Sequence, residues 1–279
     1  MRVLKFGGTS VGSVDNIQQV ITIAKKAAAQ ENIVVVVSAF AGITDLLLKS
    51  GISASTKNEY KEVLHQIYTT HIDFTKALIA DDKDAITEVE SILEELKSLL
   101  EGIHLINELS PKTIDKLLAF GEILSSTIIA RAMYAADLYA TRKDSRDLIT
   151  TNDKYTKASV NYKVTNAQLE HYFAKAKHNI TVMPGFIAST ATGETSTLGR
   201  GGSDFTAAII AAALEVDEVE IYTDVSGMYT ANPKIVKQAR PIANISYHEA
   251  MELSHFGAKV LYPPTIVPVM SKNIPIRIK

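Results

Sequence analysis

The beginning of the chain contains the clearest group of residues that could bind a phosphate. Lys5 is followed by Gly7 and Gly8, and a short apolar run before them indicates a strand. A strand, a glycine turn and a helix together aim free backbone N–H groups at an anion. The glycines let the backbone approach a phosphate without an intervening Cβ, and Lys5 would face the same phosphate with its positive charge. The alternative is an ordinary tight turn between a strand and a helix.

This turn does not follow the two common nucleotide-binding signatures. The P-loop places its lysine after the glycines and follows it with Ser or Thr. Here Gly7 and Gly12 have that glycine spacing, but Ser13-Val14 stands where Lys-Ser/Thr is required. A GxGxxG fingerprint is also absent from this segment. The position of the lysine before the glycines therefore needs another explanation.

A second glycine-rich stretch leads into a strongly helical run. It reads Leu198-Gly199-Arg200-Gly201-Gly202-Ser203-Asp204. A helix N-terminus offers N–H groups and a partial positive charge, and Ser203 or Asp204 would cap the helix well. The planar guanidinium of Arg200 suits a bidentate grip on a carboxylate. The simpler alternative is that Asp204 is only a helix cap.

An acidic residue lies within an apolar helix that we predict from about residue 114 to 136. The pair Gly121-Glu122 is unexpected there, because glycine weakens a helix and an unpaired buried glutamate is costly. The ordinary explanations are that Glu122 is exposed or that it is paired with a lysine. Ser38 and Thr44 are similarly ambiguous, because Ser and Thr are common turn and cap residues.

A parallel sheet would bring these groups together. The β-branched run Ile33–Val37 is typical of a strand buried on both faces, and residues 14–28 have helical spacing with Ser13 as the cap. This strand–helix–strand order places Lys5 and the 38–44 loop at one sheet edge, where open parallel sheets bind ligands.

The remaining chain alternates between helical and strand patterns. Residues 57–103 predict a helical hairpin inserted in the α/β unit, with its charges on a solvated face. Further predicted elements are a helix at 165–177, strands at 180–183 and 186–188, an exposed hairpin at 189–197, a strand at 219–222, a helix at 246–253 and a strand at 274–278.

The composition is that of an ordinary globular enzyme or binding domain. The chain has 279 residues, of which 46% are hydrophobic and 22% charged, and its formal net charge is −2. This charge gives no sign of a nucleic-acid or anionic-membrane partner. Zero cysteines fit a reducing cytoplasm, and neither a signal peptide nor an apolar run of transmembrane length is evident. We therefore expect a cytoplasmic protein with no nucleic-acid and no membrane partner.

Together the motifs resemble those of the aspartokinases, within the amino acid kinase family. The resemblance rests on Lys5-Phe6-Gly7-Gly8-Thr9-Ser10, the stretch 198–204, the segment 223–234 and Phe256-Gly257-Ala258-Lys259-Val260-Leu261, and it extends over nearly the whole chain. It implies a three-layer α/β/α sandwich around a largely parallel sheet, with a helical insertion at 57–103. It also implies an amino-acid-binding lobe at about 1–200 and a nucleotide-binding lobe at about 201–279.

The resemblance also implies roles for individual residues. Lys5 and Asp204 are expected to be catalytic, with the aspartate orienting the lysine. The residues expected to bind the amino acid are Ser38, Thr44, Glu122, Arg200 and Ser203, with Glu122 facing its amino group and Arg200 holding its α-carboxylate. Those expected to bind the nucleotide are Lys5, Gly7, Gly8, Thr223, Asp224, Tyr229, Lys234, Lys259 and Val260. Asn232 and Lys234 stand where Asp and Arg are common in the family, and no residue is assigned as a metal ligand.

The activity that the resemblance implies is ATP-dependent phosphorylation of the side-chain carboxylate of L-aspartate. The product would be 4-phospho-L-aspartate, the first step toward lysine, threonine and methionine, with Mg²⁺ as cofactor and a homodimer as the assembly. Two alternatives stay open: a sibling kinase acting on acetylglutamate, glutamate or UMP, and a catalytically silent nucleotide- or effector-binding module.

A last expectation concerns regulation. Chains that resemble aspartokinases usually continue into ACT-type regulatory domains, and some continue into a homoserine dehydrogenase. No such pattern follows the strand that ends at Lys279. We therefore expect a catalytic domain, natural or part of a longer protein, that is insensitive to feedback by lysine or threonine.

Overall fold

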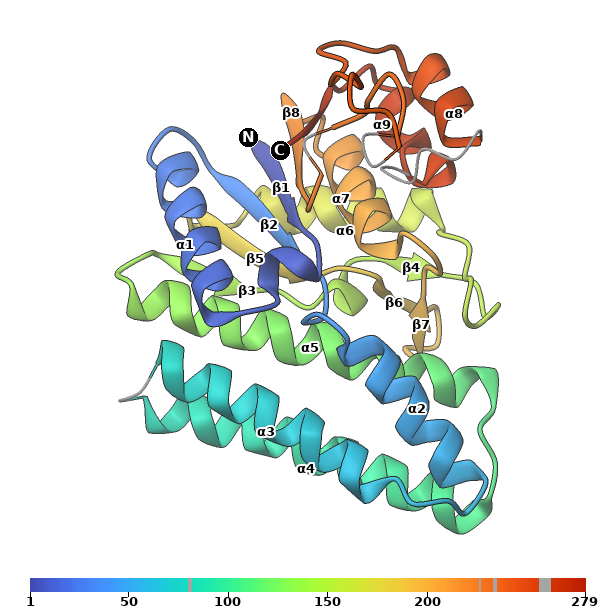
Figure 1. Ribbon diagram of the computed structural model, residues 1–279. Helices are drawn as coiled ribbons and strands as arrows, with labels where there is room; N and C mark the ends of the chain where they lie inside the picture. Colours follow the sequence, from blue (N-terminus) through green and yellow to red (C-terminus); the bar gives the residue numbers. More distant parts are fainter. Residues whose placement is uncertain (80–81, 226, 233–234, 256–261) are drawn as a thin grey trace.

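A six-stranded parallel sheet lies at the centre of the protein, in the order β3-β5-β2-β1-β8-β9 (Figure 1). The computed structural model describes residues 1–79, 82–225, 227–232, 235–255 and 262–279. The strands are β1 (Arg2–Phe6), β2 (Ile33–Val37), β3 (Ala140–Arg142), β5 (Ile180–Pro184), β8 (Glu218–Tyr222) and β9 (Ile276–Ile278). Every residue of β2 is buried, as its β-branched run predicts. Because β1 pairs with both β2 and β8, its carboxyl end lies in the middle of one sheet edge.

Helices cover both faces of this sheet, which confirms the predicted three-layer α/β/α arrangement. The helices α1 (Val14–Ala28) and α5 (Pro111–Ala135) pack on one face, and α6 (Tyr162–Phe173), α7 (Gly202–Ala213) and α9 (Val267–Met270) form the layer on the other. Successive strand residues point to opposite faces. Thus Leu4 belongs to one large hydrophobic cluster and Val3 to the other. The division into lobes at about residue 200 stays a prediction.

The predicted insertion forms a helical hairpin, and a further helix precedes it. Helices α2 (Ile43–Ser55), α3 (Lys61–Leu78) and α4 (Lys83–Ile106) pack with α5 into a bundle beside the sheet layers (Figure 1). The apolar side chains that repeat along α4 are buried in this bundle, among them Leu93, Leu96 and Leu100. Sequence analysis misses α2, because its later half is rich in Ser and Gly, which are weak helix formers.

Helix α5 is long and apolar enough, by length and composition alone, to cross a membrane. Sequence analysis predicts no apolar run long enough to cross a membrane, and α5 differs from that prediction. Its most apolar window is 78% buried inside the protein, where the helix packs against β3, β5, α2 and α4. This burial accounts for the composition, because a helix that is apolar all round is expected in a protein core as well as in a membrane.

A small second sheet lies beside the glycine-rich stretch. Its strands are β4 (Thr150–Thr151), β6 (Ile187–Thr190) and β7 (Thr195–Thr197), in the order β4-β6-β7. Segment 189–197 is a hairpin as predicted, but it is exposed only near its tip, because Ser196 and Thr197 are buried. The remaining elements are helix α8 (Tyr247–His255) and the short 3-10 helices η1 (Thr9–Val11), η2 (Ser145–Asp147) and η3 (Pro263–Thr265).

A buried acid explains why the base of this hairpin is covered. The carboxylate of Asp115, on α5, accepts hydrogen bonds from the N–H of Thr197 at 2.8 Å and its hydroxyl at 2.7 Å. It also accepts one from the N–H of Thr156 at 2.9 Å. These bonds fix the hairpin base against α5 directly before the stretch that begins at Leu198.

Candidate active site

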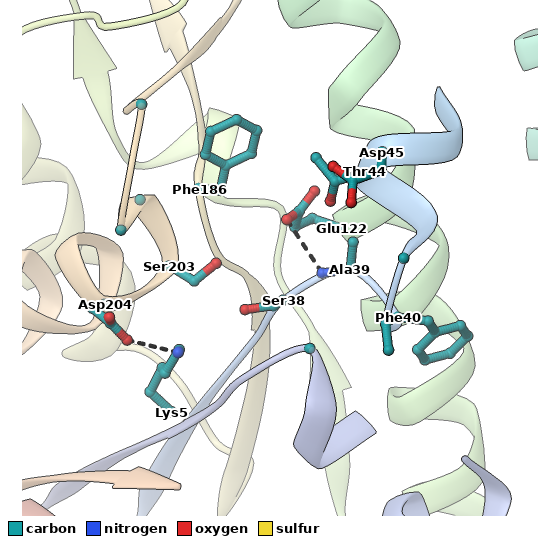
Figure 2. Close-up of a pocket in the computed structure, with 16 residues that line it drawn as sticks. Lys5, Ser38, Ala39, Phe40, Thr44, Asp45, Glu122, Phe186, Ser203 and Asp204 are labelled. Carbon is teal, nitrogen blue, oxygen red and sulfur yellow. Dashed lines mark hydrogen bonds and ion pairs between the residues drawn. The ribbon is translucent and has the colours of Figure 1, made fainter. Parts of the chain in front are cut away.

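A pocket of about 390 Å³ lies at the carboxyl edge of the central sheet, between the ends of β1 and β2 and helices α2, α5 and α7 (Figure 2). Ligands bind at this edge in open parallel sheets. Residues far apart in the sequence line it together: Lys5, Gly8, Ser38, Thr44, Glu122, Ser203 and Asp204. All of these are site residues that the sequence analysis predicts, and the structure brings them into one place.

At one end of the pocket a lysine and an aspartate form an ion pair. The Nζ atom of Lys5 lies 2.6 Å from Oδ1 of Asp204, and Lys5 is only 8% exposed. Lys5 comes from β1 and Asp204 from the first turn of α7, so the pair joins the sheet to a helix. A lysine held in a fixed position beside a pocket can stabilise negative charge that develops there. This geometry fits the orienting role expected for Asp204.

The start of α7 differs from the sequence expectation. The N-cap is Gly201, with φ +69°, and no side chain caps the helix. Such a left-handed backbone favours glycine. Gly202 also packs closely on Phe186, where an added Cβ would lie 2.5 Å from a ring carbon. Ser203 and Asp204 therefore do not cap the helix, and both side chains face the pocket (Figure 2).

At the other end of the pocket lies the buried carboxyl of Glu122. Its Oε1 atom accepts a hydrogen bond from the N–H of Ala39 at 3.2 Å. Its Oε2 atom has no hydrogen-bond partner within the described part of the chain. Burial raises the pKa of Glu122 to about 8, and the hydrogen bond from Ala39 offsets this only in part. An unpartnered acceptor that lines a pocket is a good place for the ammonium group of a ligand.

The neighbouring glycine explains how Glu122 reaches Ala39. A Cβ added at Gly121 would lie 2.7 Å from the Cβ of Ala39 and 3.4 Å from a methyl carbon of Leu47. Only glycine lets α5 approach the 38–42 loop this closely. The Gly-Glu pair that is unexpected in an apolar helix is thus explained by a contact across the pocket.

We expect Gly121→Ala to destabilise the protein and to raise the KM for a substrate whose ammonium group lies at the Glu122 end of the pocket. Alanine is the better helix former by about 1 kcal/mol, but overpacking costs about 1–3 kcal/mol and would push the loop away from Glu122. Urea unfolding and steady-state kinetics measure the two effects. Gly102→Ala, in α4, is the matched control, because nothing lies within 4 Å of a Cβ there. Equal stabilisation by both substitutions would contradict the explanation.

The loop that carries Ser38 is held from several sides. The N–H of Ser38 donates to the carbonyl oxygen of Phe6 at 3.2 Å, and its own carbonyl accepts from the hydroxyl of Ser125 at 2.8 Å. Figure 2 shows the side chains of Ser38 and Ser203 on either side of the space near the Lys5–Asp204 pair. These contacts fix the pocket wall before any ligand arrives.

The inserted α3–α4 hairpin also packs against the loop that carries Ser38, through the ring of Phe40. Phe40, which lines the pocket, stacks on His71 of α3 with ring centroids 5.3 Å apart, and contacts Phe74 at 4.9 Å. His71 is fully buried, and burial lowers its pKa to about 4, so it is neutral. Its Nδ1 lies 2.7 Å from the carbonyl oxygen of Ile67. The insertion is therefore part of the pocket's support as well as a solvated pair of helices.

The structure places Arg200 outside the pocket. Its side chain is exposed, and its guanidinium lies over the ring of Tyr262, 5.6 Å from the ring centroid. Its neighbours Gly199 and Gly201 line the pocket, so the Arg200 backbone borders the site while the side chain points elsewhere. The predicted grip on a carboxylate stays a prediction.

The glycines predicted to contact the nucleotide have different surroundings. Gly8 lines the pocket. Gly7 adjoins Lys5, and a Cβ there would lie 3.5 Å from the Lys5 Nζ atom. The N–H of Gly7 donates to the carbonyl oxygen of Tyr222 at 3.2 Å, so this group is already engaged by β8.

The other predicted nucleotide residues lie apart from the first pocket. Thr223 and Asp224 follow β8 and line a second pocket of about 340 Å³, together with Ser10 and Tyr222. Tyr229 is half-buried and lines neither of these two pockets. Lys234, Lys259 and Val260 lie outside the described residues.

Two residues that sequence reasoning misses also line the pocket. Phe186 follows β5 at the same sheet edge and has φ +65°, a conformation uncommon for a residue with a Cβ. Asp45 lies in the first turn of α2, where an acidic residue is ordinarily explained by the helix dipole. The preceding glycine signals Phe186, because it marks a turn at the end of a predicted strand. No comparable signal points to Asp45.

No group of three or more metal-binding side chains occurs in the described ranges of the chain. Asp204 is engaged by Lys5 at one end of the pocket, and the other two acidic residues of the lining, Asp45 and Glu122, lie at the opposite end. Mg²⁺ in phosphoryl-transfer sites is commonly held by one or two carboxylates plus substrate phosphates. The donor set fits an ion that arrives with its nucleotide better than an ion held by the protein alone.

Comparison of the sequence with known protein families identifies the class of protein to which this fold and site belong. The sequence profile described as the Amino acid kinase family matches residues 1–279. The chain belongs to the amino acid kinase family.

Within that family, the chain is similar to aspartokinases. It is 35% identical over 280 residues to lysine-sensitive aspartokinase 3 of Escherichia coli K12, covering 98% of this chain and 60% of that protein. It is 32% identical to bifunctional aspartokinase/homoserine dehydrogenase 1 of Zea mays, covering 99% of this chain and 30% of that protein. The crystal structure of E. coli aspartokinase III in complex with aspartate and ADP matches with a TM-score of 0.89 and 34% identity, covering 100% of this chain and 61% of that one. The chain thus spans between 30% and 61% of the length of these relatives.

Proposed function

We propose that this chain carries the catalytic part of an aspartate kinase, which transfers the γ-phosphoryl group of ATP to the side-chain carboxylate of L-aspartate. The observation that supports this best is the polarity of the first pocket. Buried Glu122 has an oxygen without a hydrogen-bond partner in the described parts of the chain, which suits the substrate ammonium at one end, and Lys5 with Asp204 suits a phosphoryl group at the other. Aspartate and ADP are also what the similar E. coli protein binds in its crystal structure.

The chemistry requires little from the protein beyond position and charge. The substrate carboxylate is already a nucleophile, so no general base is needed. The barrier falls when the two reactants are aligned and the charge on the transferring phosphoryl group is stabilised. Lys5 supplies that charge, and Asp204 holds its ammonium at 2.6 Å in the orientation that the reaction uses.

The nucleotide would bind across the carboxyl ends of β1 and β8. These strands end side by side, with Phe6 opposite Tyr222, and Thr223 and Asp224 line the second pocket together with Thr9 and Ser10, which directly follow Gly7 and Gly8. We propose that these residues and Tyr229 contact ATP, together with Lys234, Lys259 and Val260. Mg²⁺ would enter with the phosphates and neutralise part of their charge.

For Arg200 to bind the substrate α-carboxylate, its side chain must leave Tyr262 and turn towards the pocket. We expect Arg200→Lys to raise the KM for L-aspartate about tenfold and to leave the KM for ATP within twofold, because lysine keeps the charge but loses the two-pronged donor. Steady-state kinetics with each substrate varied in turn measure this. Arg277→Lys is the control, because it changes an exposed arginine on β9 that lines neither pocket. Equal changes in both KM values would mean that Arg200 supports the loop and does not contact the amino acid.

The direct test of the function is a substrate panel. ADP release would be measured with MgATP and L-aspartate, N-acetyl-L-glutamate, L-glutamate or UMP, with hydroxylamine to trap an acyl phosphate. Trapped aspartyl hydroxamate is the expected result. Turnover with another acceptor would favour a sibling kinase. ATP binding without turnover of any acceptor would favour a silent regulatory module.

We also propose a cytoplasmic location and a homodimeric assembly for the natural protein. A cytoplasmic location is supported by the absence of cysteine in the sequence, and a homodimer by the family resemblance. Light scattering on the purified chain tests the second, because a monomeric mass at micromolar concentration would contradict it.

A further inference from the structure

The end of the first pocket that we assign to the substrate ammonium carries two carboxyl groups with different surroundings. Glu122 comes from the buried face of α5 and is 4% exposed. Asp45 comes from the first turn of α2 and is exposed to solvent. Figure 2 shows Thr44 and Asp45 on the same side of the pocket as Glu122, away from the Lys5–Asp204 pair. The pocket therefore has an acidic end and a lysine end.

Glu122 alone gives this end little charge while the pocket is empty. Burial raises the pKa of its carboxyl to about 8, so at neutral pH the group is mostly protonated. Glu122 nevertheless lines the pocket, and its buried Oε2 atom has no hydrogen-bond partner among the residues that the structure describes. Glu122 thus offers a hydrogen-bond site at short range but attracts a distant cation weakly.

Asp45 has no competing partner in the described parts of the chain. No hydrogen bond or ion pair engages its carboxylate there, not even with Lys49 one turn further along α2. The other charged groups that line the pocket are Lys5 and Asp204, and these engage each other at the opposite end. The charge of Asp45 is therefore available to a ligand.

We propose that Asp45 is a specificity-determining residue of this site, which supplies the negative charge that favours substrates with a free ammonium group over dicarboxylates that lack one. The inference rests on the proposed function, because it assigns the ammonium of L-aspartate to this end of the pocket. Asp45 attracts the ammonium through water, and Glu122 then accepts its hydrogen bond. The same charge repels an anion of similar shape without an ammonium, such as succinate.

The experiment compares Asp45→Asn with the wild type at two ionic strengths. At low salt the variant should raise the KM for L-aspartate about two- to fivefold, which lies within the range expected for an exposed charge pair. It should lower the inhibition constant of succinate, measured as a competitor of L-aspartate, because a repulsion is removed. Both changes should shrink in 0.5 M salt, where charges are screened within about 4 Å. kcat and the KM for ATP should stay within twofold.

The control is Asp73→Asn, which removes an exposed charge from α3 outside the pocket. It should change neither constant. An unchanged KM for L-aspartate in Asp45→Asn, or parallel weakening of L-aspartate and succinate, would overturn the inference, because parallel weakening indicates a change of pocket shape. If the wild type itself does not phosphorylate L-aspartate, the proposed function fails first, and the assignment of Asp45 fails with it.

Discussion

Replacing Lys5 by alanine should lower kcat by about 10²- to 10³-fold, the usual loss when one preorganised group that stabilises transition-state charge is removed. The KM for ATP should change far less, because the role proposed for the lysine is to stabilise charge that develops during transfer. Its position supports this expectation: Lys5 is nearly buried, and its Nζ lies 2.6 Å from Oδ1 of Asp204. Single-turnover kinetics measured alongside the steady state would separate the chemical step from product release.

The control for this substitution is Lys97→Ala, which removes an exposed lysine from α4. It should leave kcat unchanged. Lys5→Ala also leaves Asp204 without its partner, so thermal unfolding must show that the variant is folded at the assay temperature. A folded variant with kcat within a few-fold of the wild type would mean that the Gly7-Gly8 turn is only a connection between a strand and a helix.

The second large effect should appear in the pH dependence of aspartate binding. Glu122 must ionise to pair with the substrate ammonium, and burial raises its pKa to about 8 in the empty site. Below that pH, each unit should weaken binding about tenfold, because one proton must leave before the pair forms. The KM for L-aspartate should therefore fall as the pH rises from 6 to 8, and the KM for ATP should not follow it.

Glu122→Gln removes the titrating group and provides the control. It should raise the KM for L-aspartate at pH 8 by roughly 10- to 100-fold, the cost of losing a hydrogen bond to a charged group, and should flatten the pH profile. Calorimetry in buffers of different ionisation enthalpy measures the proton directly. Equal proton release by the wild type and the variant would show that another group titrates.

The same carboxyl links pH to folding stability. Its pKa is raised from 4.5 in the unfolded chain to about 8 in the folded one, so between these values the folded state holds the extra proton. The contribution of Glu122 to the free energy of unfolding is therefore fully present below pH 4.5 and is lost as the pH rises through 8. The wild type should lose stability relative to Glu122→Gln across that window.

Much of the fold is predictable because its signals are local and repeated. The β-branched run of β2 and the apolar spacing along α4 each involve several residues that favour the same element. The site is predictable in a different way. Lys5 and Glu122 are conspicuous because their charge is unexpected in the local sequence. Lys5 is a charged residue between an apolar strand and a glycine turn, and Glu122 is an acid in an apolar helix. The pairing of Lys5 with Asp204 came from family resemblance, since nothing local connects residues so far apart.

The features that sequence analysis missed depend on contacts at long range. The burial of β7 follows from the bonds that Asp115 accepts from Thr197 and Thr156, and no periodic pattern encodes such a contact. The direction of the Arg200 side chain depends on the ring of Tyr262. Asp45 has an ordinary local explanation at the start of a helix, so only the assembled pocket distinguishes it.

Through the stacking of Phe40 on His71, a residue that does not line the pocket supports part of the pocket wall. None of the described residues of the α3–α4 hairpin lines the pocket, yet His71 and Phe74 of this hairpin contact the ring of Phe40, which does. A chimera that exchanges the whole hairpin between two relatives would thus be expected to carry acceptor preference with it. Acceptor preference could then change through substitutions in the hairpin core while every residue that lines the pocket stays the same.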